Sequence, residues 1–194
     1  MPSKMIGSEE SDLDLVCRSQ KGSRAAFQIL VQRYEKKILG LVIGMVGARD
    51  DALDITQEVF FQAFRKLRSF KKKSSFYTWL YRIAVNRAID FQRRTWKHRA
   101  IESGHEALER DMLSGNSTEG EPYEEASRIE LREKISSAIS ELTPEHRAVI
   151  LLREVEGLSY GEIGETLGCS VGTVMSRLFY ARKRLRQRLE VLLS

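Results

Sequence analysis

The sequence predicts an all-α protein, and three observations lead to that prediction. Apolar side chains recur at steps of three and four residues over long stretches, which is the period of an amphipathic helix. The 194 residues include only three prolines, while residues that favour helices are frequent. No stretch alternates apolar and polar residues for long enough to indicate a strand. We therefore expect two small helical domains joined by a flexible acidic linker, the second containing a helix-turn-helix.

Three helices are predicted in the first half of the chain. Between Phe27 and Met45 the apolar residues keep helical spacing for about five turns. A second helix follows Gly47, and one side of it carries Leu53, Phe60, Phe64 and Leu67. Residues 70–75 are expected to form a basic loop. A third helix is expected to run from Phe76 to about Trp96, with an inward face formed by Trp79, Leu80, Ile83 and Ala84.

The helical pattern is lost after Lys97 and returns near Glu124. Between them Gly, Ser, Asn and Thr accumulate among acidic residues, a composition typical of flexible linkers. We assign residues 1–98 to a first domain, 99–125 to the linker and 126–194 to a second domain. Within the second domain, Thr143 followed by Pro144 is a start signal for a helix.

Positive charge is concentrated in two parts of the chain. Residues 65–99 carry 12 basic and one acidic side chain, whereas residues 100–145 carry 4 basic and 12 acidic ones. A second basic group consists of Arg177, Arg182, Lys183, Arg184, Arg186 and Arg188. Such concentrations are typical of surfaces that bind a polyanion, most often nucleic acid. The simpler alternative is that both are solvated helix faces.

Several classes of protein are disfavoured by the sequence. No apolar run approaches the ~20 residues that span a bilayer, and the N-terminus lacks the apolar core of a secretion signal. Cys17 and Cys169 lie far apart, which excludes a disulfide framework and suits a reducing cytoplasm. The three histidines lack partners at metal-ligand spacing, and no Gly-rich phosphate loop occurs. We expect no cofactor, no metal, no small-molecule substrate and no catalytic residues.

Residues 158–184 have the spacing of a helix-turn-helix. Ser159 is placed to cap a short helix ending at Leu167, Gly168 to stop it in a left-handed conformation, and Ser170 to cap a second helix. Apolar residues expected to hold the two helices together are Ile163, Leu167, Val171, Val174, Leu178, Ala181 and Leu185. Opposite them lie Thr173, Ser176, Tyr180 and Lys183, which we interpret as a row facing DNA bases. A plain helical hairpin with a basic outer face is the alternative.

Aromatic residues are interleaved with the first basic segment. They are Phe70, Phe76, Tyr77, Trp79, Tyr81, Phe91 and Trp96. Basic groups that follow a nucleic-acid backbone, with aromatic rings for unpaired bases, are typical of single-strand capture. Most of these rings must nevertheless belong to a core. Trp79 and Phe91 are expected there, whereas Phe76, beside the basic loop, suits either role.

Three motifs occur in order: residues 52–67 (ALDITQEVFFQAFRKL), residues 76–94 (FYTWLYRIAVNRAIDFQRR) and the helix-turn-helix at 157–185. In this arrangement the chain resembles a bacterial RNA polymerase sigma factor. With only two domains on a short linker, it is similar to the extracytoplasmic-function group. The resemblance implies an alternative sigma factor that directs core polymerase to promoters, often in a stress or envelope response. It also implies three partners: core RNA polymerase, promoter DNA as duplex and melted strand, and an anti-sigma protein.

Residues carried over from the family form three sets. The D-x-x-Q-E-x-F pattern, which docks on the clamp helices of the largest polymerase subunit, maps onto Asp54, Gln57, Glu58 and Phe60. Recognition and opening of the −10 element map onto Lys73, Ser74, Ser75, Phe76, Asn86, Asp90, Arg93 and Arg94. Recognition of the −35 duplex maps onto Ser170, Gly172, Thr173, Ser176, Arg177, Phe179, Tyr180, Arg182 and Lys183. Without the resemblance, the first set reads equally well as a solvated face.

The sequence also departs from the family. The loop KKKSS is more basic than the loops often seen, and Met175 and Tyr180 stand where relatives often carry Arg. Because Met175 cannot donate to a guanine edge, a −35 sequence different from the usual GGAAC type is expected.

Two further functions remain open at this stage. A stand-alone helix-turn-helix regulator would leave the first motif unexplained, and a DNA-processing enzyme lacks any candidate catalytic cluster. A separate hypothesis is that the acidic segment 100–145 lies against the basic helix 76–96 and masks it.

Overall fold

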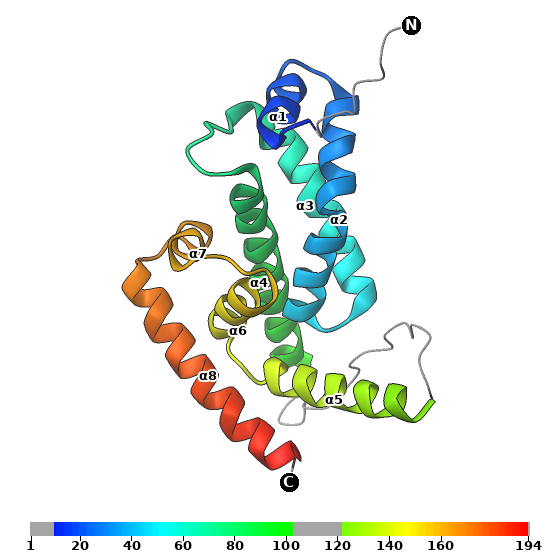
Figure 1. Ribbon diagram of the computed structural model, residues 1–194, viewed down its shortest axis with the longest axis vertical. Helices are drawn as coiled ribbons and strands as arrows, with labels where there is room; N and C mark the ends of the chain where they lie inside the picture. The colour runs from blue at the N-terminus through cyan, green and yellow to red at the C-terminus, as the bar shows by residue number, and fades with distance from the viewer. Residues whose placement is uncertain (1–9, 103–121, 194) are drawn as a thin grey trace, which may run out of the picture.

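The computed structural model describes residues 10–102 and 122–193, and within these ranges it contains helices and no strand. The α-helices are α1 (Asp12–Gln20), α2 (Arg24–Val46), α3 (Arg49–Lys66), α4 (Phe76–Glu102), α5 (Pro122–Ser140), α6 (Pro144–Ile150), α7 (Tyr160–Leu167) and α8 (Val171–Leu193). A 3-10 turn (Leu67–Ser69) follows α3, and a π-helical turn (Leu151–Val155) follows α6. The predicted all-α class is confirmed (Figure 1).

The helices reach further than the sequence analysis expected. α4 continues to Glu102 and α5 begins at Pro122, so both extend into the segment assigned to a linker. The middle of that segment, residues 103–121, lies outside the described residues. No helix of the described part is long and apolar enough to cross a membrane.

α2, α3 and α4 form the centre of the first half, with α1 packed across α2. The side chains of Ser11 and Ser23 cap α1 and α2 by accepting hydrogen bonds from backbone amides. Arg33 and the Tyr34 hydroxyl on α2 both donate to Asp12 on α1, which fixes the angle between these helices. The buried residues of α2 include Phe27, Leu30, Ile38 and Met45, as the helical period predicts.

The predicted apolar side of the second helix is confirmed in part, because Phe60 and Leu67 are buried. α3 packs on α2 and α4 through Ala52, Ile55, Val59, Phe60 and Ala63. Leu53 and Phe64 are partly exposed instead. The small side chains of Ala52 and Ala63 let neighbouring helices approach closely, so they share the contact with Phe60 in place of Leu53 and Phe64.

α4 buries Leu80, Ile83 and Ala84 as predicted, while Trp79 and Phe91 are only partly buried against the same core. Phe76, at the start of α4, is 4% exposed and packs among the rings of Phe70, Tyr34 and Trp79. Residues 70–75 before it are not helical, as expected.

The helix-turn-helix is present with the predicted caps. Ser159 accepts from the amide of Glu162, whose carboxylate accepts from the Ser159 amide at 2.8 Å, forming a capping box. Gly168 ends α7 with φ 64°, and Ser170 accepts from the amide of Thr173 at 3.2 Å. Val174, Leu178 and Ala181 are buried, but Val171 is exposed, contrary to the prediction. Val171 is the first residue of α8 and is 46% exposed.

The carboxylate of Glu162 makes this cap sensitive to acid. Hydrogen bonds from the Ser159 hydroxyl and amide, and from Tyr77, lower the pKa of Glu162 below its ordinary value of 4.5. A lowered folded-state pKa gives stability that is present above pH 4.5 and is lost as the pH falls through the lowered value. The variant Glu162→Gln is expected to be less stable by about 1 kcal/mol at pH 7, and the difference from the wild type is expected to be smaller at pH 3. Urea unfolding at both pH values measures this, with Glu165→Gln on the same helix as the control.

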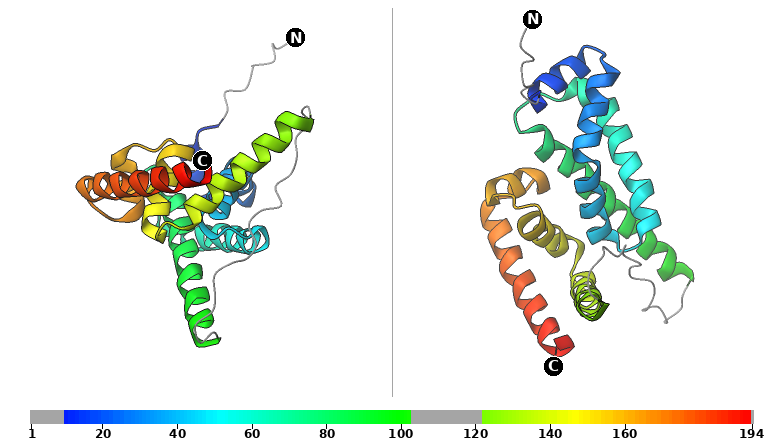
Figure 2. Two further views of the ribbon diagram at one scale, coloured as in Figure 1. Left: turned by 90° about the horizontal axis from the view of Figure 1, so that it is seen from below. Right: turned by 45° about the vertical axis from the view of Figure 1, so that its right-hand side comes forward.

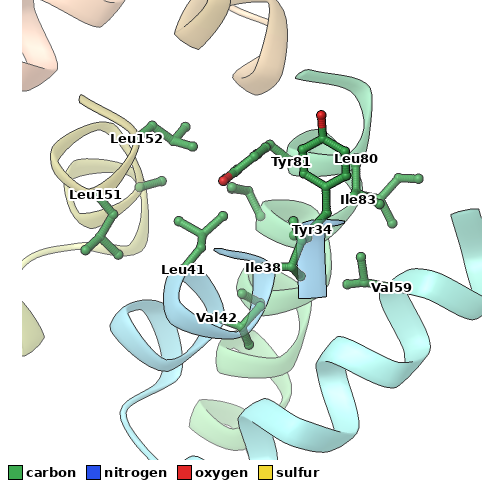
Figure 3. Packing of buried hydrophobic residues seen from close by; sticks show 14 of the residues in the cluster. Tyr34, Ile38, Leu41, Val42, Val59, Leu80, Tyr81, Ile83, Leu151 and Leu152 are labelled. Carbon is green, nitrogen blue, oxygen red and sulfur yellow. The ribbon is translucent and has the colours of Figure 1, made fainter. Parts of the chain in front are cut away.

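The two halves of the chain pack together rather than standing apart on a tether (Figures 1 and 2). α4 lies against α7, and the end of α2 lies against α6 and the π-helical turn. One continuous cluster of buried residues includes Leu41 and Tyr81 from the first half and Leu151 and Leu152 from the second (Figure 3). A Cβ atom placed on Gly44 would lie 2.9 Å from the methyl carbons of Leu151, so the glycine permits this contact.

Polar contacts accompany this packing. The Tyr81 hydroxyl donates to Glu156, and the Tyr77 hydroxyl donates to Glu162 at 3.1 Å. Arg82 donates to the backbone carbonyl of Glu165. Burial, followed by the nearby carboxylates, raises the pKa of Tyr77 to about 12 and the pKa of Tyr81 further. Both phenols therefore remain protonated donors throughout the physiological pH range.

Candidate nucleic-acid and polymerase interfaces

An acidic edge lies along α3. Asp54, Gln57 and Glu58 are exposed on adjacent turns, and Glu58 lies 3.6 Å from Arg87 of α4. Arg87 also donates to Gln62 at 2.9 Å, which ties the edge to α4. Phe60, the fourth residue of the predicted set, is buried. Phe60 is 8% exposed and packs in the core of the first half.

Phe61 is exposed on this edge and was missed by the sequence analysis. Its ring is 65% exposed, and the guanidinium of Arg65 lies 5.7 Å from the ring centroid. Phe61 lies three residues after Glu58 and seven after Asp54, so it shares their exposed side of the helix. That spacing was the available signal. With the partly exposed Leu53 and Phe64, Phe61 adds apolar area beside the acidic residues, a combination typical of protein–protein contacts.

The basic loop before α4 has two kinds of residues. Lys71, Lys72 and Lys73 are exposed, and Lys72 adopts φ 56° with its ammonium 3.0 Å from the Cys17 sulfur. Ser75 caps α4, since its hydroxyl accepts from the Thr78 amide at 3.1 Å. Ser74 is partly buried, and Phe76 is in the core as described above. The lysines of the loop are therefore available to a partner, whereas the Phe76 ring is buried and packs against Phe70 at the start of the loop.

The outer face of α4 gathers the remaining residues predicted for −10 recognition. Asn86, Asp90, Arg93 and Arg94 are all exposed, and the first three follow steps of four and three on one side of the helix. Arg93 lies 3.9 Å from Glu145 at the start of α6. This is a contact between the basic helix and the acidic segment 100–145. The part of that segment at 103–121 lies outside the described residues, as do the side chains from Trp96 onward in α4.

α8 carries the residues predicted for −35 recognition. Ser176 donates to the Thr173 carbonyl at 3.0 Å, and the hydroxyls of Thr173 and Ser170 are 2.9 Å apart. Phe179, Tyr180 and Lys183 are exposed, with the two rings 5.4 Å apart at 79°. Arg177 is partly buried and Gly172 is exposed. Arg182 pairs with Glu154 at 2.6 Å, and this hydrogen bond raises the pKa of Arg182.

No group of three or more potential metal ligands occurs among the described residues. The predicted site residues that are exposed lie on one acidic edge with apolar neighbours, on α3, and on two basic faces, on α4 with its preceding loop and on α8. The acidic edge and the first basic face belong to the first half of the chain, and the second basic face belongs to the last helix.

Comparison with known proteins shows which family the chain belongs to. The family model described as "Sigma-70 region 2" matches residues 30–98, and "Sigma-70, region 4" matches residues 132–185. The RNA polymerase sigma-H factor of Pseudomonas aeruginosa is 38% identical over 195 residues, covering 95% of this chain and 97% of the relative. The chain belongs to the sigma-70 family of bacterial RNA polymerase sigma factors.

Other relatives place this sigma factor in the extracytoplasmic-function group. The ECF RNA polymerase sigma-E factor of Escherichia coli K12 is 39% identical over 186 residues, covering 94% of this chain and 96% of the relative. Among solved structures, CnrH in complex with the cytosolic domain of CnrY matches with a TM-score of 0.71 and 26% identity, over 94% of this chain and 99% of that one. The sigma factor directs RNA polymerase to promoters, which fits these findings better than a stand-alone regulator does.

Proposed function

We propose that this sigma factor contacts core polymerase through the edge of α3, the −10 element through the basic loop and outer face of α4, and the −35 element through α8. In this proposal residues 1–98 act as region 2, 99–125 as a linker and 126–194 as region 4. The observation that carries the proposal is the presence, in one chain, of an acidic edge for a protein and two separate basic faces for DNA. A stand-alone regulator needs only the last of these.

The three surfaces suit three different tasks. The exposed carboxylates and amide of α3, beside Phe61, offer polar and apolar contacts to a protein. The cations of the loop and Arg93 and Arg94 follow a DNA backbone, while Asn86 and Asp90 supply hydrogen-bonding groups for bases. α8 enters the major groove as the second helix of a helix-turn-helix. Duplex opening then draws on binding energy, so we assign the chain no catalytic activity of its own.

The cellular location, the physiological role and the expected regulatory partner of the chain follow from the same proposal. A subunit of bacterial RNA polymerase works in the cytoplasm, and extracytoplasmic-function factors typically serve stress or envelope responses. The solved relative CnrH is described with the cytosolic domain of another protein, CnrY. We expect this chain likewise to have an anti-sigma partner.

Run-off transcription tests the proposal. Core RNA polymerase is incubated with genomic fragments, with and without the full-length protein. Discrete new transcripts that require the protein are expected, and their start sites identify both promoter elements. The proposal is wrong if no transcript appears and the protein alone binds duplex DNA tightly, because that result describes a stand-alone regulator.

The α3 edge makes a separate prediction. Asp54→Ala is expected to weaken binding to core polymerase about tenfold, because it removes one charged hydrogen-bonding group at an interface. Fluorescence anisotropy of the labelled protein with core polymerase measures this affinity. Glu35→Ala, which removes an exposed carboxylate from α2, is the matched control. Equal affinities for wild type and Asp54→Ala would remove α3 from the polymerase interface.

A further inference from the structure

An exposed apolar row lies on the first turns of α8. Val171, Met175 and Phe179 are spaced four residues apart and therefore share one side of the helix. Met175 is 54% exposed and Phe179 is 64% exposed, with Val171 also exposed. Val171 was predicted to hold the two helices together, and Met175 was expected to change the −35 sequence without a base contact being assigned to it. Three neighbouring apolar side chains in water are unfavourable, which indicates that a partner covers them.

The row is distinct from the face that holds α8 in the fold. Val174, Leu178 and Ala181 are fully buried and pack toward α6 and α7. Successive residues are about 100° apart on a helix, so Met175 points well away from its buried neighbour Val174. In Figure 1, α8 runs along the outer edge of the molecule, with α7 between its first residues and α4. The packing of the two halves therefore leaves the row uncovered.

The surroundings of the row favour duplex DNA as the partner. Arg177, Arg182, Lys183, Arg184 and Arg186 follow within α8, and the only acidic residue of this helix is Glu190, near its end. Positive charge of this density suits phosphates and disfavours an apolar protein surface alone. The row also occupies the N-terminal turns of the second helix in a helix-turn-helix, and these turns contact base edges in the major groove.

The chemistry of the row selects among bases. Guanine and adenine offer hydrogen-bonding atoms in the major groove, whereas thymine adds a C5-methyl group that apolar side chains contact. Met175 and Phe179 have no hydrogen-bond donor for a guanine. Of the polar residues beside them, Ser176 already donates its hydroxyl to the Thr173 carbonyl. Apolar contacts are therefore what the row itself offers to a base pair, whereas polar contacts come from the neighbouring side of α8 with Thr173, Tyr180 and Lys183.

Given the proposed function of α8 at the −35 element, we propose that Met175 and Phe179 recognise thymine methyl groups there. Four residues of helix rise about 6 Å, which corresponds to about two base-pair steps. The −35 element of this sigma factor thus contains two thymines about two steps apart, on one strand or on both. Met175 is a specificity residue that selects thymine over guanine at its position.

The test replaces single methyl groups in the promoter. Holoenzyme is assembled from core polymerase and the full-length chain, on a promoter found by run-off transcription. Each thymine of the −35 element is replaced in turn by deoxyuridine, which lacks only the C5-methyl group. Wild-type holoenzyme is expected to bind about fourfold more weakly at two of these positions, the effect of losing one buried methyl group.

Variants assign the methyl groups to side chains. In Met175→Ala the loss at one of the two positions is expected to disappear, because no side chain remains to contact that methyl group. Met175→Arg is expected to prefer guanine at the same position. Leu13→Ala, an exposed apolar residue on α1, serves as the control and keeps both losses.

The outcomes separate this inference from the proposed function. Absence of any holoenzyme-dependent transcript contradicts the proposed function itself. Promoter-specific transcription without any effect of deoxyuridine overturns the thymine inference alone. If Met175→Ala weakens core polymerase binding but leaves the deoxyuridine losses in place, the thymine inference is also overturned. The row is then assigned to a protein partner.

Discussion

Replacement of Arg147 by methionine is expected to lower the free energy of unfolding by about 3–5 kcal/mol. Arg147 lies in α6 and is only 8% exposed. Its guanidinium donates to four backbone carbonyls, those of Ile139, Leu142, Ser140 and Met45. Methionine fills the space but removes the donor from the carbonyls of Ser140 and Leu142, while that of Met45 keeps Gln92 and that of Ile139 keeps the Leu142 amide. Loss of buried hydrogen bonds is more destabilising than the loss of an exposed ion pair.

The position of these carbonyls explains why the effect is large. Ile139, Ser140 and Leu142 lie at the end of α5 and in the turn after it, whereas Met45 belongs to the end of α2. Arg147 therefore joins the two halves of the chain. Urea unfolding monitored by circular dichroism measures the change, with Arg132→Met on the exposed side of α5 as the control. A loss below about 1 kcal/mol would contradict this account.

Gly164→Ala is expected to destabilise the helix-turn-helix by about 1–3 kcal/mol. A Cβ atom at this position would lie 2.9 Å from the backbone carbonyl oxygen of Cys169 and 3.9 Å from Val174. The carbonyl belongs to the turn between α7 and α8 and cannot rotate away as a side chain would. The turn must therefore open, which displaces the start of α8 and is expected to weaken −35 binding as well.

Gly161→Ala is a matched control within the same helix. A Cβ atom placed on Gly161 would have the Ser159 hydroxyl oxygen as its nearest neighbour, at 4.0 Å, so alanine fits without strain. Since alanine favours helices, this variant is expected to be as stable as the wild type or slightly more so. If thermal unfolding gave both alanine variants the same melting temperature, close approach at Gly164 would not be the reason for that glycine.

Local signals in the sequence were enough to predict most of the helices and the turn of the second half, although α1 (Asp12–Gln20) was missed. The apolar period located α2, and Ser159, Gly168 and Ser170 each have the capping role expected of them. These features depend on a few neighbouring residues, so a sequence contains them in full. The roles of the site residues in polymerase and promoter binding stay predictions.

Contacts between distant segments were less accessible from the sequence. The period of α3 indicated an apolar side but not that small residues would decide which neighbours approach it. Phe76 suited the core or the DNA face equally until its position among Phe70 and Trp79 was known. Arg147 was not singled out by the sequence analysis. The burial of Arg147 depends on backbone carbonyls of other helices that accept its hydrogen bonds, and the local sequence around Arg147 does not predict these contacts.

The packing of α4 on α7 sets an energetic threshold for promoter binding under the proposed function. Elements centred at −10 and −35 are about 85 Å apart on straight DNA, at about 3.4 Å per base pair. A folded chain of 194 residues has a radius of gyration of about 16 Å, so the packed form does not span both elements. The halves must separate first, and every 1.4 kcal/mol by which the packed form is favoured reduces the apparent affinity about tenfold. Tyr77, Tyr81 and Arg82 thus adjust promoter affinity without touching DNA, and core polymerase acts as the ligand that selects the extended population.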